Sequence, residues 1–236
     1  WRIPLQHRTG NGHVYCSSFM SEDEATGTLL KHLDGPVLAE PRALKFQTGH
    51  RSRFWDRNCV AVGLSSGFME PLESTSIHLI QTAVSRIANF FPHQGFDAAD
   101  IAEYNAMTLW EYERIRDFLI LHYKATERTG SPFWEHCRHM TVPPSLQRKM
   151  DLFASNGRLF RDGEELFAEV SWLQVMVGQR HRPLGHHPFA DLLPESDVLA
   201  YLAHVQGVIA KCVDVMPTQA EFIAANCAAP RMGAPA

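Results

Sequence analysis

The sequence predicts an α+β fold in which a β-rich segment is followed by a mainly helical region. Short runs compatible with strands, separated by turn residues, fill about residues 1–65. From residue 73 onward, apolar residues recur at the 3.6-residue spacing of helices. This order favours a sheet layer continued by a helical lid. We therefore divide the chain into two parts, 1–92 and 93–236.

The β-rich part begins with a predicted hairpin. Strands are expected at residues 3–7 and 13–17, around a turn at residues 8–12 in which Gly10, Asn11 and Gly12 tolerate positive φ. A helix is expected at residues 22–33, which has acidic residues in its first turn. Further strands are expected at 43–47 and 58–62. The continuous apolar run at 59–62, which ends at Gly63, is typical of a buried strand.

The helical part is predicted from apolar periodicity and from its breakers. Apolar residues recur over 74–91 until Pro92 stops the pattern, and a long helix is expected over 97–123. Shorter helices are expected at 131–139, 144–154 and 171–178. A loop rich in Pro, His and Gly follows at 179–188. The last two helices are expected at 195–215 and 218–225.

Composition narrows the class of protein. The 236 residues are 45% hydrophobic and 20% charged, as in ordinary soluble globular proteins, and the net charge of -4 argues against a nucleic-acid or anionic-membrane partner. No apolar run reaches the roughly 18 residues of a membrane span. The five cysteines are scattered without a CxxC pair, so neither a disulfide framework nor a structural zinc site is expected. Free thiols suit a cytoplasmic protein.

The segment GLSSGFMEPLESTSI, at residues 63–77, has the highest density of chemically active side chains. It is predicted to be a glycine-containing loop leading into the N-terminus of a helix, where free N–H groups and the helix dipole attract anions. A capped helix after a turn is the alternative, and Glu73 stands where an N-cap or first-turn carboxylate would stand. Two carboxylates, a proline and three hydroxyls within seven residues exceed what a cap requires.

This segment resembles the part of flavin-dependent tryptophan halogenases that closes over the flavin and holds the halide. WRIP at the start resembles the second half of the GWxWxIP signature of that family. NCVAVG and HRTGNGHVYCSSF resemble the strand before the loop and the hairpin after the signature. The similarity is clear over about 1–92 and looser to about 134. It implies the C-terminal part of a flavin-monooxygenase-like α/β FAD-binding fold, with residues 93–236 as the helical substrate-side region.

The resemblance also implies a reaction. In that family, reduced FAD from a separate flavin reductase reacts with oxygen and with chloride or bromide. The resulting hypohalous acid reaches a lysine beside an electron-rich aromatic substrate, of indole or tryptophan type, and halogenates it. The matching positions are Glu73 as the catalytic carboxylate; Thr75 and Ser76 at the halide; Gly63, Leu64, Ser65 and Ile77 at the flavin; and Trp1 and Pro4 along the route to the substrate.

The chain also departs from the family pattern. The GxGxxG-type nucleotide loop is absent, and no lysine stands in the context of the catalytic one. The chain opens in what reads as a strand under way. We therefore expect a C-terminal fragment that is inactive alone and needs the N-terminal half of the same protein, with a homodimer as a possible assembly.

The helical region contains the expected substrate contacts. Phe167 and Trp172 are the nearest candidates. The segment 166–179 contains only four polar anchors, Glu169, Ser171, Gln174 and Gln179, and no arginine or lysine that could meet a carboxylate. Indole, or a similar small or peptide-like aromatic, is therefore favoured over free tryptophan.

Other interpretations stay open. The fold could serve a flavin-dependent monooxygenase or oxidoreductase that does not halogenate, or a non-catalytic remnant or binding module. We interpret the histidines of 136–139 and 181–187 as solvated surface and expect no metal. The basic cluster Arg51, Arg53 and Arg57 could meet flavin phosphate or a reductase, but a solvated turn is the simpler interpretation. Trp134 could be a substrate platform rather than core.

Overall fold

The computed structural model describes residues 1–5 and 7–228 of the chain. The chain divides into two compact units. Residues 1–42 and 188–236 form unit 1, and residues 43–187 form unit 2. Unit 2 contains the segment 63–77, in which the chemically active side chains are concentrated.

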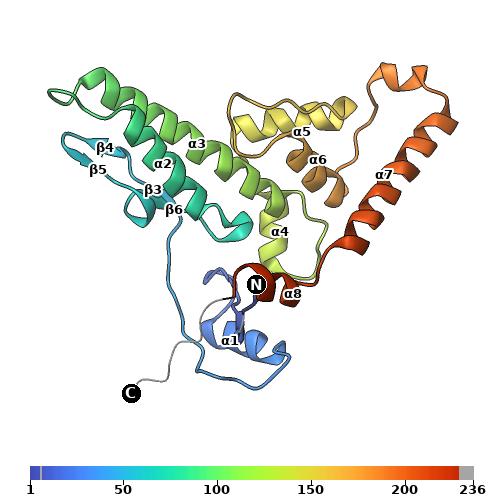
Figure 1. Ribbon diagram of the computed structural model, residues 1–236, viewed down its shortest axis with the longest axis horizontal. Coiled ribbons are helices and arrows are strands. Elements are labelled where there is room, and N and C mark those ends of the chain that lie inside the picture. The colour runs from blue at the N-terminus through green and yellow to red at the C-terminus, as the bar shows by residue number, and fades with distance from the viewer. Residues whose placement is uncertain (6, 229–236) are drawn as a thin grey trace. The chain divides into compact units, whose positions relative to one another are not determined.

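The strands of unit 2 are short and form two antiparallel pairs beside α2 and α3 (Figure 1). β3 (Gly49–His50) pairs with β6 (Gly67–Phe68), and β4 (Trp55–Asp56) pairs with β5 (Cys59–Val60). The expected strand at 43–47 is wrong, because no described segment pairs with these residues and an isolated strand leaves its backbone hydrogen bonds unmade. Of the strand expected at 58–62, only the two residues of β5 are found in a strand. Cys59 is exposed there, because β5 is one edge of a two-stranded hairpin and not a buried strand.

The helices of unit 2 lie close to their expected positions. They are α2 (Ser76–Asn89), α3 (Ala98–Lys124), α4 (Pro132–His139), α5 (Pro144–Asn156) and α6 (Glu169–Gly178). Local chemistry sets several of their ends. The Asp97 carboxylate accepts a hydrogen bond from Ala99 N at 2.7 Å and caps α3. Gly157 adopts φ 66° just after α5, the left-handed conformation that often ends a helix.

Helix α3 contributes to two hydrophobic cores. Near β4 and α2 the core contains Phe54, Trp55, Leu79, Tyr104, Tyr112, Ile115 and Leu119. Near α4, α5 and α6 the core contains Phe118, Leu121, Val142, Leu146, Met150, Phe153, Trp172 and Met176. The two compact units therefore do not coincide with the two parts, 1–92 and 93–236, that the sequence predicts. Leu79 on α2 and Tyr104 on α3 lie on opposite sides of that division and share one core.

Unit 1 begins with a hairpin, as predicted, but with a different register. β1 (Arg2–Pro4) pairs antiparallel with β2 (Thr9–Asn11), so the second strand falls where the turn was expected. The expected strand at 13–17 is wrong, because the ladder ends with the pairing of Trp1 and Gly12, whose N–H and carbonyl groups bond each other at 3.0 and 2.8 Å. Residue 6, within the expected first strand, lies outside the described residues.

The remaining elements of unit 1 are helical. They are α1 (Glu22–Lys31), η3 (Pro188–Leu192), α7 (Glu195–Val215) and α8 (Gln219–Asn226). Ser21 and Glu24 form a capping box at α1, and Thr218 and Glu221 form another at α8. Both boxes satisfy helix N–H groups that have no partner within the helix.

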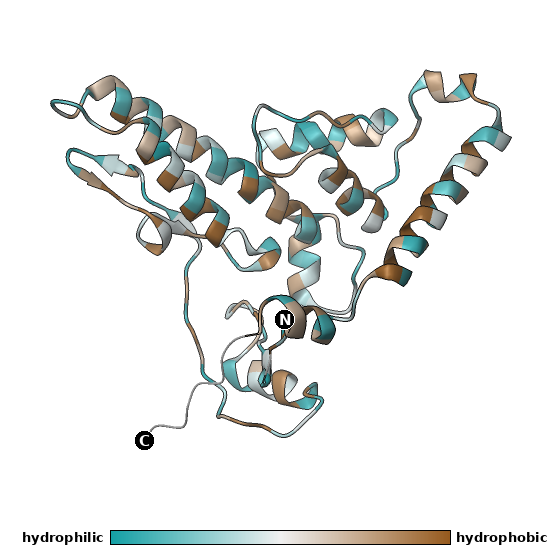
Figure 2. Ribbon diagram, in the orientation of Figure 1, coloured by the Kyte–Doolittle hydropathy of each residue, from teal (hydrophilic) through white to brown (hydrophobic). Residues whose placement is uncertain are grey.

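Helix α7 is long and apolar enough to cross a membrane by length and composition, although polar residues interrupt its apolar sequence. Figure 2 shows hydrophobic residues distributed along it. Length and composition alone do not distinguish a membrane span from a helix that packs against protein.

Candidate active site

A tight turn at residues 63–67 joins β5 to β6, and its own serines hold it together. Gly63 has φ 64°, a left-handed conformation that favours glycine. The Ser65 hydroxyl accepts a hydrogen bond from Val62 N at 3.1 Å and donates one to Val62 O at 2.8 Å. The Ser66 hydroxyl donates to Gly63 O at 2.7 Å. These bonds fix the backbone of the turn.

Arg51, which directly follows β3, fixes the same turn. Its backbone N–H donates to Ser66 O at 2.8 Å, and its Nε donates to Ser65 O at 2.5 Å. The sequence favours a solvated basic turn here, and Arg51, Arg53 and Arg57 are all exposed. The exposed Arg51 side chain also has a specific backbone partner in Ser65.

Glu73 lies in strained backbone between this turn and α2. Glu73 and Ser74 adopt φ of 65° and 52°, a left-handed region that non-glycine residues rarely enter and that costs about 1–3 kcal/mol per residue. A right-handed helix cannot include such residues, so α2 begins at Ser76 and not at the expected residue 74. Glu73 is therefore not the helix cap that the alternative interpretation made it.

The Glu73 side chain reaches across to α3. Its Oε1 lies 3.0 Å from Nε2 of His122, whose Nδ1 lies 2.8 Å from the Phe118 carbonyl oxygen. A carbonyl oxygen only accepts, so Nδ1 carries a proton. Glu73 and His122 thus place a carboxylate and an imidazole, an acid–base pair, at contact distance.

Thr75 and Ser76 stand at the start of α2. Thr75 is buried, and its side chain makes no capping hydrogen bond within the described part of the chain. The start of α2 is held from outside by Glu111 of α3. The Glu111 carboxylate bonds His78 at 2.9 Å, Thr82 at 3.0 Å and Arg86 at 2.7 Å, on successive turns of α2.

The four residues expected at the flavin come from adjacent elements. Gly63, Leu64 and Ser65 form η1 (Gly63–Ser65), and Ile77 is in the first turn of α2. A Cβ added at Gly63 would lie 3.4 Å from Ile80, one turn along α2, so the two elements are in contact. Leu64 is 78% exposed and Ile77 is 71% exposed. Exposed apolar side chains beside a glycine turn fit a flat aromatic cofactor that would cover them.

The two expected substrate contacts differ in accessibility. Phe167 is half-buried and stacks on Phe118 with ring centroids 3.9 Å apart, and Phe118 also contacts the His122 ring at 4.9 Å. The structure thus brings Phe167 near the Glu73–His122 pair. Trp172 is 1% exposed, and its Nε1 donates to Phe167 O at 3.1 Å. The Trp172 interpretation is wrong, because its ring fills the core and leaves no face for a substrate.

Trp1 and Pro4 belong to unit 1. Pro4 ends β1, and Trp1 packs one side of its indole ring over Gly12, where an added Cβ would lie 2.2 Å from the ring. The indole is nonetheless 59% exposed. Gly12 is needed here because any larger residue would displace the ring, and the exposed surface of the ring is accessible for contact.

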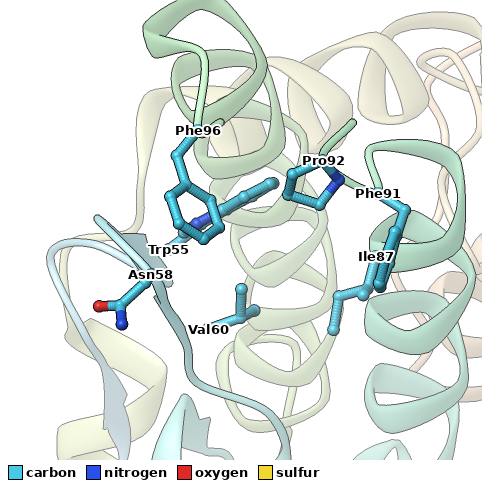
Figure 3. A pocket seen from close by; sticks show the side chains of 7 residues that line it. All are labelled: Trp55, Asn58, Val60, Ile87, Phe91, Pro92 and Phe96. Atoms are coloured by element: carbon cyan, nitrogen blue, oxygen red, sulfur yellow. The ribbon is translucent and has the colours of Figure 1, made fainter. Parts of the chain in front are cut away.

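A cavity of about 360 Å³ opens between the β4–β5 hairpin and the turn that joins α2 to α3 (Figure 3). Its walls are apolar except for Asn58. The other lining residues are Trp55, Val60, Ile87, Phe91, Pro92 and Phe96. None of these side chains is an acid or a base, so the cavity lacks the groups that proton transfer requires. It lies at the opposite end of α2 from Thr75 and Ser76.

Several contacts of this site were missed in the sequence. His122, Glu111 and Tyr112 have no role in the sequence-based expectations, which give only a long helix over 97–123. The signal that could have found them is a polar residue on the apolar face of a long helix, as His122 is after Ile115 and Phe118. Among residues 1–5 and 7–228, no cluster of three or more His, Cys, Asp or Glu side chains could hold a metal.

The fold is that of flavin-dependent halogenases of known structure. Xcc4156 from Xanthomonas campestris superposes with a TM-score of 0.93 at 48% identity, over 98% of this chain and 46% of that one. BrvH from Brevundimonas sp. BAL3 superposes with a TM-score of 0.90 at 44% identity, over 95% and 46%. Both are flavin-dependent halogenases.

The tryptophan halogenase family model matches residues 1–195. This chain belongs to the tryptophan halogenase family. It is 35% identical over 232 residues to the 7-chloro-L-tryptophan 6-halogenase KtzR of Kutzneria sp., and 30% identical over 233 residues to the tryptophan 6-halogenase SttH of Streptomyces toxytricini. Each match covers 95% of this chain and 44% of the relative, so the chain spans less than half the length of these relatives.

Proposed function

We propose that this chain supplies the catalytic carboxylate and the halide-facing loop of an FAD-dependent halogenase. The observation that carries the proposal is Glu73, a carboxylate held in strained backbone and paired with His122. Strain of this kind persists only where the surroundings enforce it, and it is concentrated at functional sites. A structural cap would need neither the strain nor the histidine.

Each residue has a defined task in this proposal. Glu73 orients the halogenating species and accepts the proton that the aromatic ring loses, and His122 holds the carboxylate in place. Thr75 and Ser76 bind chloride or bromide at the start of α2. Gly63, Leu64, Ser65 and Ile77 contact the flavin. Trp1 and Pro4 line the route between flavin and substrate, and Phe167 provides an aromatic wall.

The chain needs partners for this reaction. A separate flavin reductase supplies reduced FAD. Together with oxygen, the reduced FAD provides the oxidising power that converts halide into an electrophile. The nucleotide portion of FAD would be bound by a flavin-binding region equivalent to the half of the relatives that this chain does not match. That region would also supply the catalytic lysine. We propose that the 236 residues alone are inactive, and that the complete protein works in the cytoplasm without a metal.

The substrate we propose is a neutral, electron-rich aromatic of indole type. Of the polar side chains in 166–179, the Glu169 carboxylate already accepts a hydrogen bond from Arg161 N at 3.1 Å. Gln179 donates to the His122 carbonyl at 3.5 Å. Free tryptophan would bring an ammonium and a carboxylate that need partners of their own, because unpaired buried charges are costly.

A flavin-dependent monooxygenase is the second candidate, because the fold alone would also serve hydroxylation. The mass of the product discriminates the two. The complete protein, with reduced FAD, oxygen, bromide and indole, should give a product with the isotope doublet of bromine. A hydroxylated product, formed equally without halide, would favour the monooxygenase.

A further inference from the structure

A buried hydrogen bond joins α3 to the turn at residues 63–67. The Tyr112 hydroxyl lies 2.9 Å from the Ser66 hydroxyl, and the two residues are 3% and 5% exposed. The Tyr112 ring packs in the core near β4 and α2. The hydroxyl has no packing function, so its contact with the turn needs a separate explanation.

The direction of this hydrogen bond is fixed. The Ser66 hydroxyl has one proton, which it donates to Gly63 O at 2.7 Å, so its oxygen must accept from Tyr112. Burial raises the pKa of the Tyr112 hydroxyl, which therefore keeps its proton. A relay of two hydrogen bonds thus runs from Tyr112 through Ser66 to Gly63, the residue with positive φ.

Tyr112 is itself held rigidly. Its ring contacts those of Phe54 and His50, with centroids 5.2 and 5.6 Å away. The preceding residue, Glu111, bonds three successive turns of α2. Two adjacent residues of one helix therefore fix the turn at 63–67 and the helix that follows it.

We propose that Tyr112 is a positioning residue for the flavin, acting through Ser66 on the turn at 63–67. This inference rests on the proposed function, in which Gly63, Leu64 and Ser65 contact the cofactor. Removal of the Tyr112 hydroxyl leaves the Ser66 oxygen buried with one partner fewer, so the turn keeps its other hydrogen bonds but is held less firmly in the geometry that fits the flavin.

The test uses Tyr112→Phe in the complete protein, with Tyr104→Phe as the matched control. Tyr104 is a buried tyrosine of the same helix and the same core, and its hydroxyl has no hydrogen-bond partner within the described part of the chain. FAD affinity, measured by quenching of flavin fluorescence, should fall about three- to tenfold in Tyr112→Phe, the effect of one lost hydrogen bond. Tyr104→Phe should bind FAD as the wild type does.

Steady-state kinetics distinguish positioning from general destabilisation. Tyr112→Phe should raise the KM for reduced FAD and leave the KM for bromide unchanged. Ser66→Ala removes the bond to Gly63 O as well as the bond to Tyr112, so it should weaken FAD binding at least as much as Tyr112→Phe. The double variant should bind FAD no more weakly than Ser66→Ala, because Tyr112 acts on the turn through Ser66. In the 236-residue chain itself, amide hydrogen exchange at 63–67 should be faster in Tyr112→Phe and unchanged in Tyr104→Phe.

Two outcomes would overturn the inference separately from the proposed function. If wild-type protein binds FAD and Tyr112→Phe binds it equally well, Tyr112 does not position the flavin. If both tyrosine variants lose the same affinity, the effect comes from core packing. If the complete wild-type protein binds no FAD at all, the proposed function fails, and this inference fails with it.

Discussion

Glu73 and His122 are joined by a contact of 3.0 Å between Oε1 and Nε2, although one lies in a loop and the other near the end of α3. The second ring nitrogen of His122 is committed to the Phe118 carbonyl at 2.8 Å. The ring therefore cannot turn away from Glu73 without losing a bond. The carboxylate is held in one orientation by a group that can also exchange a proton with it.

The first prediction concerns cofactor retention. The nucleotide-binding loop is absent from the 236 residues, so the purified chain alone should carry no FAD. Its absorbance spectrum should lack the flavin bands, and they should appear when the flavin-binding half is supplied. A stoichiometric, tightly bound flavin in the isolated chain would contradict the proposal that FAD binding needs the flavin-binding half.

A second prediction concerns the halide. Thr75 and Ser76 stand where first-turn N–H groups of α2 are oriented to receive an anion. Crystals of the complete protein grown with FAD and soaked in bromide should show an anomalous peak in contact with one of them. A clear peak elsewhere, with none at the start of α2, would show that the halide binds at another place.

The third prediction concerns the substrate. With the complete protein, a flavin reductase and bromide, kcat/KM should be higher for indole than for tryptophan, because 166–179 contains no arginine or lysine and two of its four polar side chains, Glu169 and Gln179, already have hydrogen-bond partners within the chain. Competition between the two compounds in one reaction gives the ratio directly. A higher kcat/KM for tryptophan would mean that its charged groups find anchors outside 166–179.

The fourth prediction concerns stability. Lys149 is buried and lies 2.8 Å from the buried Glu165 carboxylate. Lys149→Met leaves that carboxylate without its counter-ion and should destabilise the chain by about 3–5 kcal/mol. Arg148→Met, on the same helix, breaks a half-exposed pair with Asp162 and should cost less than about 1 kcal/mol. Urea unfolding of the three proteins makes the comparison, and equal losses would refute it.

Helices were the most predictable part of this fold. The helix expected at 97–123 is found as α3 (Ala98–Lys124), because apolar periodicity and the Asp97 cap both lie within the local sequence. α7 (Glu195–Val215) matches its expected range between two prolines. Strands were the least predictable, because β2 and β5 belong to short hairpins whose register depends on the geometry of the turn, and strands of two or three residues leave little pattern to detect.

The residues of the candidate site could be proposed from the sequence, but their geometry could not. The density of functional groups indicated the segment 63–77, and the family resemblance indicated Glu73 within it. The positive φ of Glu73 and its histidine partner depend on tertiary contacts that the local sequence does not show. Trp172 illustrates the opposite error. An aromatic residue near polar neighbours suggested a substrate contact, whereas its helix turns the ring into the core.

The measurement that tests the central claim most directly is the rate of halogenation after replacement of Glu73 by glutamine in the complete protein. Glutamine keeps the shape of the side chain but accepts no proton, so product formation should fall by about two or more orders of magnitude, as for loss of a positioned acid or base. FAD affinity should stay unchanged, and Glu127→Gln, an exposed carboxylate paired with Arg180, should retain full activity. An undiminished rate in Glu73→Gln would show that this strained carboxylate has no part in the chemistry.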